Sequence, residues 1–163
     1  MKILVTGGLG SVGRPLVTLL VDHGHSVKVI GRRPEAEVAD ELIPGTAYAP
    51  CDINDFSAIR QQVRGMDTII HLAAIPAPMM ASGDEIFRIN CAGTFNVYEA
   101  AAQEGIKRVV SASSINALGF FYGVKTFPLQ YLPIDLVYVL SQPVDVHSSL
   151  RKGFARHDEA CAI

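Results

Sequence analysis

The stretch Ile3-Leu4-Val5-Thr6-Gly7-Gly8-Leu9-Gly10-Ser11-Val12-Gly13 decides the fold of this chain. A short apolar run leads into three glycines spaced Gly-x-x-Gly-x-x-Gly, and a helical pattern follows. Gly7 lets the backbone turn in a conformation that a Cβ penalises. Gly10 lets phosphate approach the main chain, and Gly13 lets the helix pack closely on the strand. The stretch therefore predicts a strand, a phosphate-binding turn and a helix N-terminus, which together form a dinucleotide site.

The composition is that of a globular chain, and its 163 residues suffice for one domain, or for one domain and a fragment. The net charge is −2 with both signs scattered, so we expect no nucleic-acid partner. No apolar stretch is long enough for a membrane span, and we expect a cytoplasmic protein with no membrane partner. Cys51, Cys91 and Cys161 lack metal-ligand spacing. We therefore expect no metal site and read these cysteines as reduced, buried packing residues.

Strand and helix patterns alternate through the first 112 residues. Strands are expected at residues 2–6, 26–30, 46–51, 67–73 and 107–112. Helices are expected at residues 12–23, 35–42, 54–63 and 84–103. This alternation predicts an α/β fold, a Rossmann-type doubly wound parallel sheet. Because crossovers between parallel strands are right-handed, the expected strand order is 3-2-1-4-5.

The character of the sequence changes after residue 119. We expect residues 1–119 to form a dinucleotide-binding Rossmann domain. Residues 120–163 are rich in aromatic side chains, are interrupted by prolines and end without a regular period. We expect an irregular segment there in place of a complete substrate domain, so the C-terminal part of the fold is expected to be incomplete.

Five motifs in order resemble the extended short-chain dehydrogenase/reductases, and most closely the NAD-dependent epimerase/dehydratase family. They are the glycine turn, Cys51-Asp52-Ile53, His71-Leu72-Ala73-Ala74, Asn90-Cys91-Ala92-Gly93-Thr94-Phe95-Asn96-Val97 and Ser111-Ala112-Ser113-Ser114. The resemblance covers residues 1 to about 119. It implies hydride transfer between NAD or NADP and a sugar, sugar nucleotide or related alcohol. The implied cofactor contacts are Gly7, Gly10, Ser11, Val12, Gly13, Asp52, Ile53, Leu72, Ala73, Ala74 and Asn90.

Several of these residues also have a purely structural interpretation. Asp52 contacts adenine in the resemblance, but it could be a loop or cap residue. His71 is better interpreted as a packed strand residue than as a ligand or base. Asn90 lies mid-helix, where a buried amide needs a partner, which indicates a structural or site-organising role. The resemblance gives Ser114 the task of binding the substrate oxygen, with Ser113 as second choice.

The cofactor choice depends on the end of the strand at residues 26–30. An acidic residue there accepts the ribose hydroxyls of NAD, whereas an arginine accommodates the 2′-phosphate of NADP. Gly31 takes the acidic place, and Arg32 and Arg33 follow. Since arginine suits phosphate through its planar donors, the pair favours NADP. Two solvated turn residues are the alternative, and the family mostly uses NAD, so both cofactors stay open.

The acid/base pair of the family, a Tyr followed four residues later by a Lys, is absent from the sequence. Without a neighbouring cation, a Tyr titrates near about 10 and is a poor base. The nearest match is Tyr138, with Gln142 in the Lys position. Tyr138 is therefore the one candidate acid/base, beside Ser114 and the site-organising Asn90. The alternative, a hydrophobic segment with an incidental Tyr, is the better interpretation of this stretch.

Three interpretations follow. The chain is an active oxidoreductase or epimerase whose Lys is lost or displaced, a catalytically inactive dinucleotide-binding module, or a truncated or frame-altered fragment. Association as a homodimer also stays open.

Overall fold

The structure, a computed structural model, describes residues 1–113. Within this part, Met1–Ala112 forms one compact unit. A five-stranded parallel sheet in the order β3-β2-β1-β4-β5 lies at its centre. The predicted Rossmann-type fold and strand order are confirmed. The predicted boundary at residue 119 and the segment 120–163 lie outside the described residues.

The strands agree closely with their predicted positions. They are β1 (Lys2–Thr6), β2 (Ser26–Gly31), β3 (Ala47–Pro50), β4 (Thr68–His71) and β5 (Val109–Ser111). Strand β4 ends two residues earlier than predicted. The amide of Leu72 still donates to the backbone carbonyl of Thr6, but the amide of Ala73 donates to the side-chain oxygen of Thr6 instead.

The helices are more divided than the sequence pattern predicts. They are α1 (Gly13–Asp22), α2 (Glu35–Val38), α3 (Phe56–Val63), α4 (Gly83–Phe87) and α5 (Thr94–Gln103). Short 3-10 helices follow at η1 (Ala39–Glu41) and η2 (Pro78–Met80), and the π-helix η3 (Arg88–Gly93) joins α4 to α5. The helix predicted at residues 84–103 is thus a continuous run with one wider turn, a feature frequent at functional sites.

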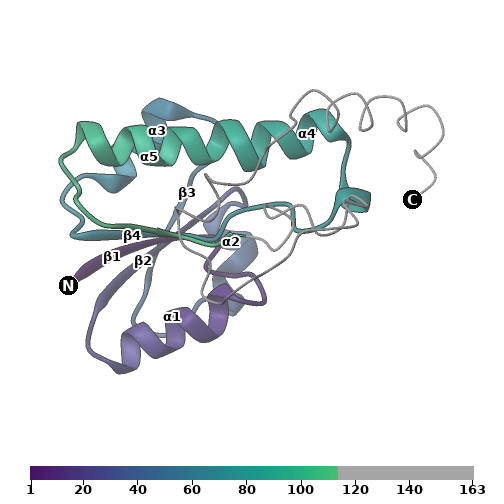
Figure 1. Cartoon of the computed structure of the whole chain (residues 1–163). Helices are drawn as coiled ribbons and strands as arrows, with labels where there is room; N and C mark the ends of the chain where they lie inside the picture. Colours follow the sequence, from purple (N-terminus) through teal and green to yellow (C-terminus); the bar gives the residue numbers. More distant parts are fainter. Residues whose placement is uncertain (114–163) are drawn as a thin grey trace, which may run out of the picture. The chain divides into compact units, whose positions relative to one another are not determined.

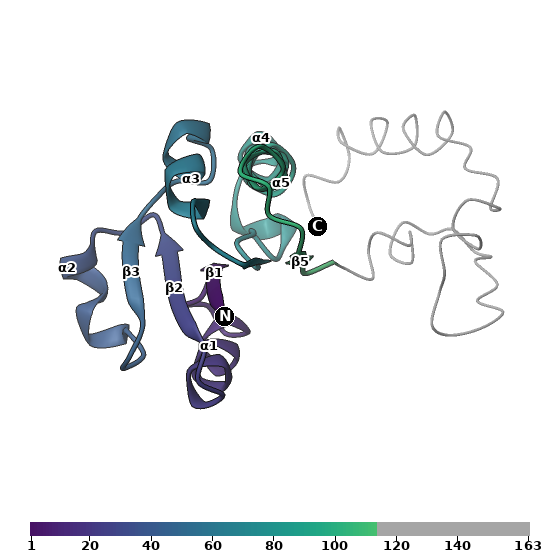
Figure 2. The ribbon, with the colours of Figure 1, turned by 90° about the vertical axis from the view of Figure 1, so that its left-hand side faces the viewer.

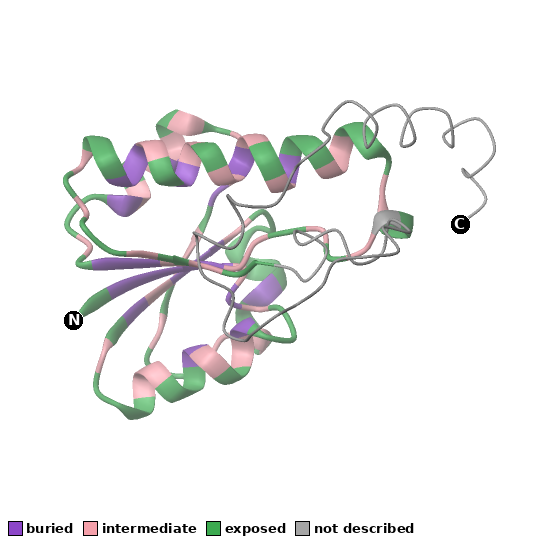
Figure 3. Ribbon diagram, viewed as in Figure 1, coloured by how far each residue is buried: buried purple, intermediate pink, exposed green. Residues whose placement is uncertain are grey.

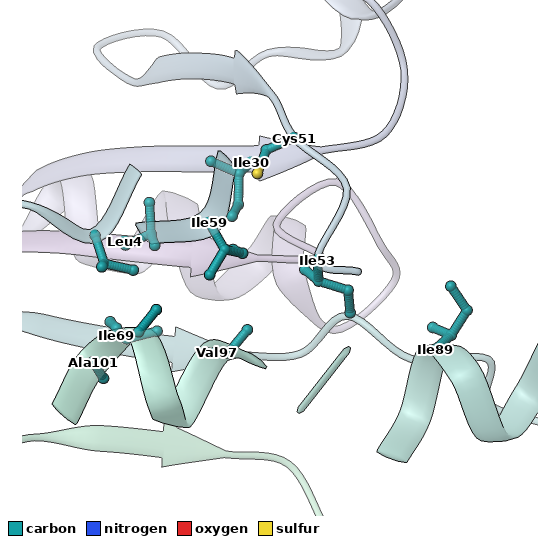
Figure 4. Close-up of a cluster of buried hydrophobic side chains, with 11 residues drawn as sticks. Leu4, Ile30, Cys51, Ile53, Ile59, Ile69, Ile89, Val97 and Ala101 are labelled. Atoms are coloured by element: carbon teal, nitrogen blue, oxygen red, sulfur yellow. The ribbon is translucent and has the colours of Figure 1, made fainter. Parts of the chain in front are cut away.

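The helices cover the sheet on both faces. Helix α1 lies on one face, and α3 and α5 lie on the other (Figure 1 and Figure 2). Side chains alternate along β1, so Ile3 and Val5 pack with Val17 of α1. Leu4 points the other way and packs with Ile59 of α3 and Val97 of α5, as Figure 4 shows. The middle of the sheet is accordingly buried (Figure 3).

Local signals at helix ends agree with the sequence. Asp55 caps α3, where its carboxylate accepts a hydrogen bond of 3.0 Å from the amide of Ala58. Gly24 follows α1 with φ of +76°, a conformation that favours glycine.

The cysteines agree only in part with the expectation. Cys51 is buried, but Cys91 is exposed, so the prediction of a buried thiol is wrong for Cys91. The reason is that η3 turns Ile89 and Gly93 toward the core instead. Cys161 lies outside the described residues. No helix in residues 1–113 has the length and apolar character that a membrane crossing requires.

Candidate dinucleotide-binding site

The glycine turn connects β1 to α1 and is tightly packed. Gly7 has φ of +69°, and a Cβ there would lie 2.8 Å from the backbone nitrogen of Ala73. A Cβ at Gly13 would collide with the carbonyl oxygen of Gly7. Gly10 is exposed, and its amide donates a 3.0 Å hydrogen bond to that same carbonyl. The turn therefore leaves its outer surface open while its inner surface admits only glycine at Gly7 and Gly13.

The N-terminus of α1 adds hydrogen-bond donors beside this turn. The first amides of a helix have no partner within the helix and carry the positive end of its dipole. Within the described residues, no side chain caps this end, and its first turn contains no acidic residue. Ser11 and Val12 lie exposed here. Such a cradle suits a pyrophosphate.

A pocket of about 210 Å³ opens beside Gly7, at the carboxyl ends of the strands. It is lined by Gly7, Ile30, Gly31, Arg32, Cys51, Ile53, Ala73, Ala74, Ile75 and Ile89. Figure 4 shows three of these side chains near the strand ends, with Ile89 on the neighbouring helix. Apolar walls with few polar groups are typical of small-molecule and cofactor sites. Because Gly7 belongs to both the turn and the pocket, the two fit the phosphates and the adenosine of one dinucleotide.

The predicted cofactor residues separate into three groups. Gly7, Arg32, Ile53, Ala73 and Ala74 line the pocket, and Gly10, Ser11, Val12 and Gly13 form the turn beside it. Leu72 packs in the cluster on the α1 side of the sheet, and Asp52, Arg33 and Asn90 are not among the lining residues but adjoin them in the sequence. The predicted catalytic residues Ser114 and Tyr138 lie outside the described residues.

Five of the lining residues were not predicted as site residues: Ile30, Gly31, Cys51, Ile75 and Ile89. Three of them, Ile30, Gly31 and Cys51, stand at or just after strand ends, where the fold class itself predicts a ligand. That signal was present in the sequence. The inward position of Ile89 depends on the π-helix, which no pattern in the sequence indicates.

Asp52 closes a turn before α3. Its carboxylate accepts hydrogen bonds of 2.9 Å from both the backbone amide and the side-chain amide of Asn54. Burial raises the pKa of Asp52, but these bonds and the charges of Arg88 and Arg32 outweigh it, so the pKa is lowered. The turn role is therefore present in the structure, and the adenine contact stays a prediction.

Asn90 holds the segment that follows β4. Its side-chain oxygen accepts from the amide of Ile75 at 2.8 Å, and its side-chain nitrogen donates to the carbonyl of Ile75 at 2.9 Å. The amide thus finds the partners that its mid-helix position demands. Since Ile75 lines the pocket, this geometry supports the predicted organising role.

His71 is a buried strand residue, as interpreted from the sequence. Its Nδ1 lies 2.7 Å from Thr6 Oγ1 and its Nε2 lies 2.9 Å from Thr94 Oγ1. Burial lowers its pKa, which favours the neutral imidazole. In residues 1–113, no group of three or more His, Cys, Asp and Glu side chains is placed to hold a metal ion.

Comparison with known proteins decides the family. The model of the 3-beta hydroxysteroid dehydrogenase/isomerase family matches residues 4–127. The chain belongs to this family. The match confirms the resemblance to the short-chain dehydrogenase/reductases of the epimerase/dehydratase type that the five motifs indicated.

Individual relatives agree with the family. Uronate dehydrogenase of Pseudomonas putida is 32% identical over 120 residues, which are 74% of this chain and 43% of that protein. L-arabinose 1-dehydrogenase (NAD(P)(+)) of Haloferax volcanii is 40% identical over 113 residues, covering 69% and 41%. A variant of uronate dehydrogenase from Agrobacterium tumefaciens, complexed with NAD, superposes with a TM-score of 0.60 at 32% identity, covering 69% and 40%. The chain therefore spans about two fifths of the length of these relatives.

Proposed function

We propose that this chain is the dinucleotide-binding part of an NAD(P)-dependent oxidoreductase or epimerase that acts on a sugar, a sugar nucleotide or a related alcohol. The observation that carries the proposal is the junction at Gly7, where the phosphate cradle meets an apolar pocket. The relatives support it, because they include dehydrogenases of uronates and of arabinose, one of them complexed with NAD.

Each part of the site has a task in this proposal. The turn from Gly7 to Gly13 holds the pyrophosphate through backbone amides. Asp52 and Ile53 hold the adenine end, and Ala73 and Ala74, which line the pocket, form the opposite wall. Asn90 keeps that wall in place through Ile75. When bound, the cofactor supplies a nicotinamide ring that accepts or donates a hydride.

The catalytic roles rest on the sequence. We propose that Ser114 binds and polarises the reacting oxygen and that Tyr138 exchanges its proton. Gln142 in place of Lys cannot lower the pKa of that Tyr by charge. This departure favours a second candidate function, a module that binds the dinucleotide without turning it over.

Titration of the full chain with NAD⁺ and NADP⁺ tests binding. We expect a saturable calorimetric signal for at least one of them. Gly13→Ala should abolish it, because the added methyl collides with the Gly7 carbonyl. Gly83→Ala is the matched control, since a Cβ there meets nothing within 4 Å among the described residues. Circular dichroism separates lost binding from lost folding. No binding by the folded, unmodified chain would overturn the proposal.

A turnover assay separates the two candidate functions. NAD(P)H formation is followed with uronates, aldoses, nucleotide sugars and a 3β-hydroxysteroid as substrates. Turnover that disappears in Tyr138→Phe supports the enzyme and the role of that Tyr. Saturable binding with no turnover on any of them supports the inactive module.

The proposal extends to the cellular compartment and the oligomeric state of the protein. We propose that it acts in the cytoplasm, where its dinucleotides are available. A pair of identical copies is the assembly to test, because Phe87, Phe95 and Tyr98 are 44–66% exposed along α4 and α5. Size-exclusion chromatography with light scattering measures the mass of the full chain in solution. The mass of a monomer would exclude the homodimer.

A further inference from the structure

The residues at the carboxyl end of β2 bear on which dinucleotide the chain binds, a question that rests on the proposed function. This strand end meets the adenosine ribose in folds of this type, where a carboxylate accepts the hydroxyls of NAD. Here Gly31 stands at that place and lines the pocket. The position supplies no carboxylate.

The structure also closes this position to a larger side chain. A Cβ at Gly31 would lie 3.0 Å from the hydroxyl oxygen of Tyr48, which is closer than ordinary contact. That hydroxyl is held in place, because it donates a hydrogen bond of 2.7 Å to the carbonyl of Arg33. Tyr48 itself comes from β3, which pairs with β2 alongside. An acidic residue at position 31 would therefore require the hydrogen-bonded Tyr48 hydroxyl to shift by a few tenths of an ångström.

The two arginines that follow Gly31 are in different situations. Arg33 directs both terminal nitrogens to Glu41, at 2.6 and 2.8 Å. Arg14 of α1 lies 3.7 Å from the same carboxylate. A guanidinium whose two terminal nitrogens both donate to one carboxylate is engaged in a bidentate pair, and those donors are not available to a ligand. Arg33 is thus a structural residue that ties the end of β2 to η1.

Arg32 is in a different situation from Arg33. Among the described residues it makes no ion pair, and it lines the pocket beside Gly31. The nearby carboxylate of Asp52 is already engaged by Asn54. The positive charge of Arg32 also reaches this carboxylate, where it helps to lower the pKa against the opposing effect of burial. Among residues 1–113, Arg32 is thus a cation without an ion-pair partner at the ribose end.

We propose that Arg32 binds the 2′-phosphate of NADP(H), and that this chain prefers NADP(H) to NAD(H). A 2′-phosphate at the end of β2 can accept hydrogen bonds from the guanidinium of Arg32, which is unpaired within residues 1–113. Because position 31 is a glycine, no carboxylate at that position repels the phosphate. Arg33 contributes by fixing the backbone, not by contacting the phosphate.

Calorimetry on the full chain tests the preference. The probes are NADP⁺, NAD⁺, 2′,5′-ADP and 5′-AMP. A charge-assisted contact predicts that each 2′-phosphorylated probe binds about tenfold to hundredfold more tightly than its counterpart at low salt. The ratio should fall toward one as salt is raised, because the contact is exposed to solvent.

Variants assign the effect to one residue. Arg32→Gln should bring the ratio close to one while the affinity for NAD⁺ stays within about twofold, and Arg32→Lys should keep part of the preference. Arg64→Gln is the matched control and should keep the ratio, because Arg64 pairs with Glu104 and does not line the pocket. Equal or tighter binding of NAD⁺ by the unmodified chain, or an equal loss for both cofactors in Arg32→Gln, would overturn the inference and leave the proposed function standing. A chain that binds neither dinucleotide would overturn both.

Discussion

The Nδ1 atom of His71 lies 2.7 Å from the hydroxyl oxygen of Thr6, and both residues are buried. The other ring nitrogen, Nε2, lies 2.9 Å from the hydroxyl oxygen of Thr94. One imidazole thus joins the last residue of β1, the last residue of β4 and the first residue of α5. These are the elements that border the phosphate cradle and the pocket wall.

The neighbours of this ring determine its protonation. The Thr94 hydroxyl donates to the carbonyl of Asn90 at 2.7 Å, so it accepts from Nε2–H of His71. The Thr6 hydroxyl accepts from the amide of Ala73 at 3.0 Å and donates to Nδ1. All groups are satisfied when the imidazole is neutral and carries its proton on Nε2. The chain of bonds ties the segment after β4 to the strand that leads into the glycine turn.

Removing the Thr6 hydroxyl should therefore be costly. Thr6→Val leaves Nδ1 of His71 without a donor and the Ala73 amide without its side-chain acceptor. Buried groups left unpaired cost about 1–3 kcal/mol, and the expected loss in the free energy of unfolding is of that size. Thr6→Ser keeps the hydroxyl and is the control. Urea denaturation of the full chain measures both, and equal stability of Thr6→Val and Thr6→Ser would contradict the assigned network.

The lowered pKa of His71 gives the stability a pH dependence. Burial favours the neutral ring, so the folded pKa lies below the ordinary value of 6.5. The unfolded chain then binds the proton more readily than the folded chain. The contribution of His71 is fully present above about pH 6.5 and is lost as the pH falls, by at most about 1.4 kcal/mol per pH unit.

A variant isolates this contribution from the other histidines. In His71→Gln, a side chain that does not titrate replaces the ring. The free energy of unfolding of the unmodified chain should decrease more steeply between pH 7 and pH 5 than that of the variant. Denaturation series at several pH values measure both slopes. Parallel slopes would show that the buried ring does not resist protonation.

The sequence predicted the fold and the cradle because both depend on local patterns. The apolar strands, the alternation and the glycine spacing are short-range features, and the described residues confirm the strand order. The pocket was harder to predict, because Ile75 and Ile89 enter it through Asn90 and the π-helix. The different roles of Arg32 and Arg33 depend on Glu41, which lies eight residues after Arg33 and is brought back by η1. Such pairings arise from tertiary structure and leave no periodic signal.

Asn90 offers a test of how the pocket wall is held. Asn90→Ala removes both hydrogen bonds to Ile75, whereas Asn90→Asp keeps the acceptor and loses the donor. We expect faster amide hydrogen exchange at Ile75 in Asn90→Ala and an intermediate rate in Asn90→Asp. We also expect Asn90→Ala to weaken dinucleotide binding. Exchange at Ile75 that matches the unmodified chain would show that the segment is held without this amide.

The two described cysteines should differ strongly in reactivity. Cys51 is 6% exposed, and burial, with the nearby charges of Asp55 and Asp52, raises its pKa to about 11. The thiolate is the nucleophile, so at pH 8 only about one thousandth of the Cys51 side chains would be reactive even with full access. Cys91 is exposed and should react first with iodoacetamide. Peptide mass spectrometry follows each site separately, and Cys91→Ser provides the control without the fast site.

Because Cys51 lines the pocket, a bound dinucleotide should slow its labelling further and leave Cys91 unchanged. Labelling of Cys51 as fast as that of Cys91, or equal protection of both by the dinucleotide, would contradict the position of Cys51 in the pocket wall.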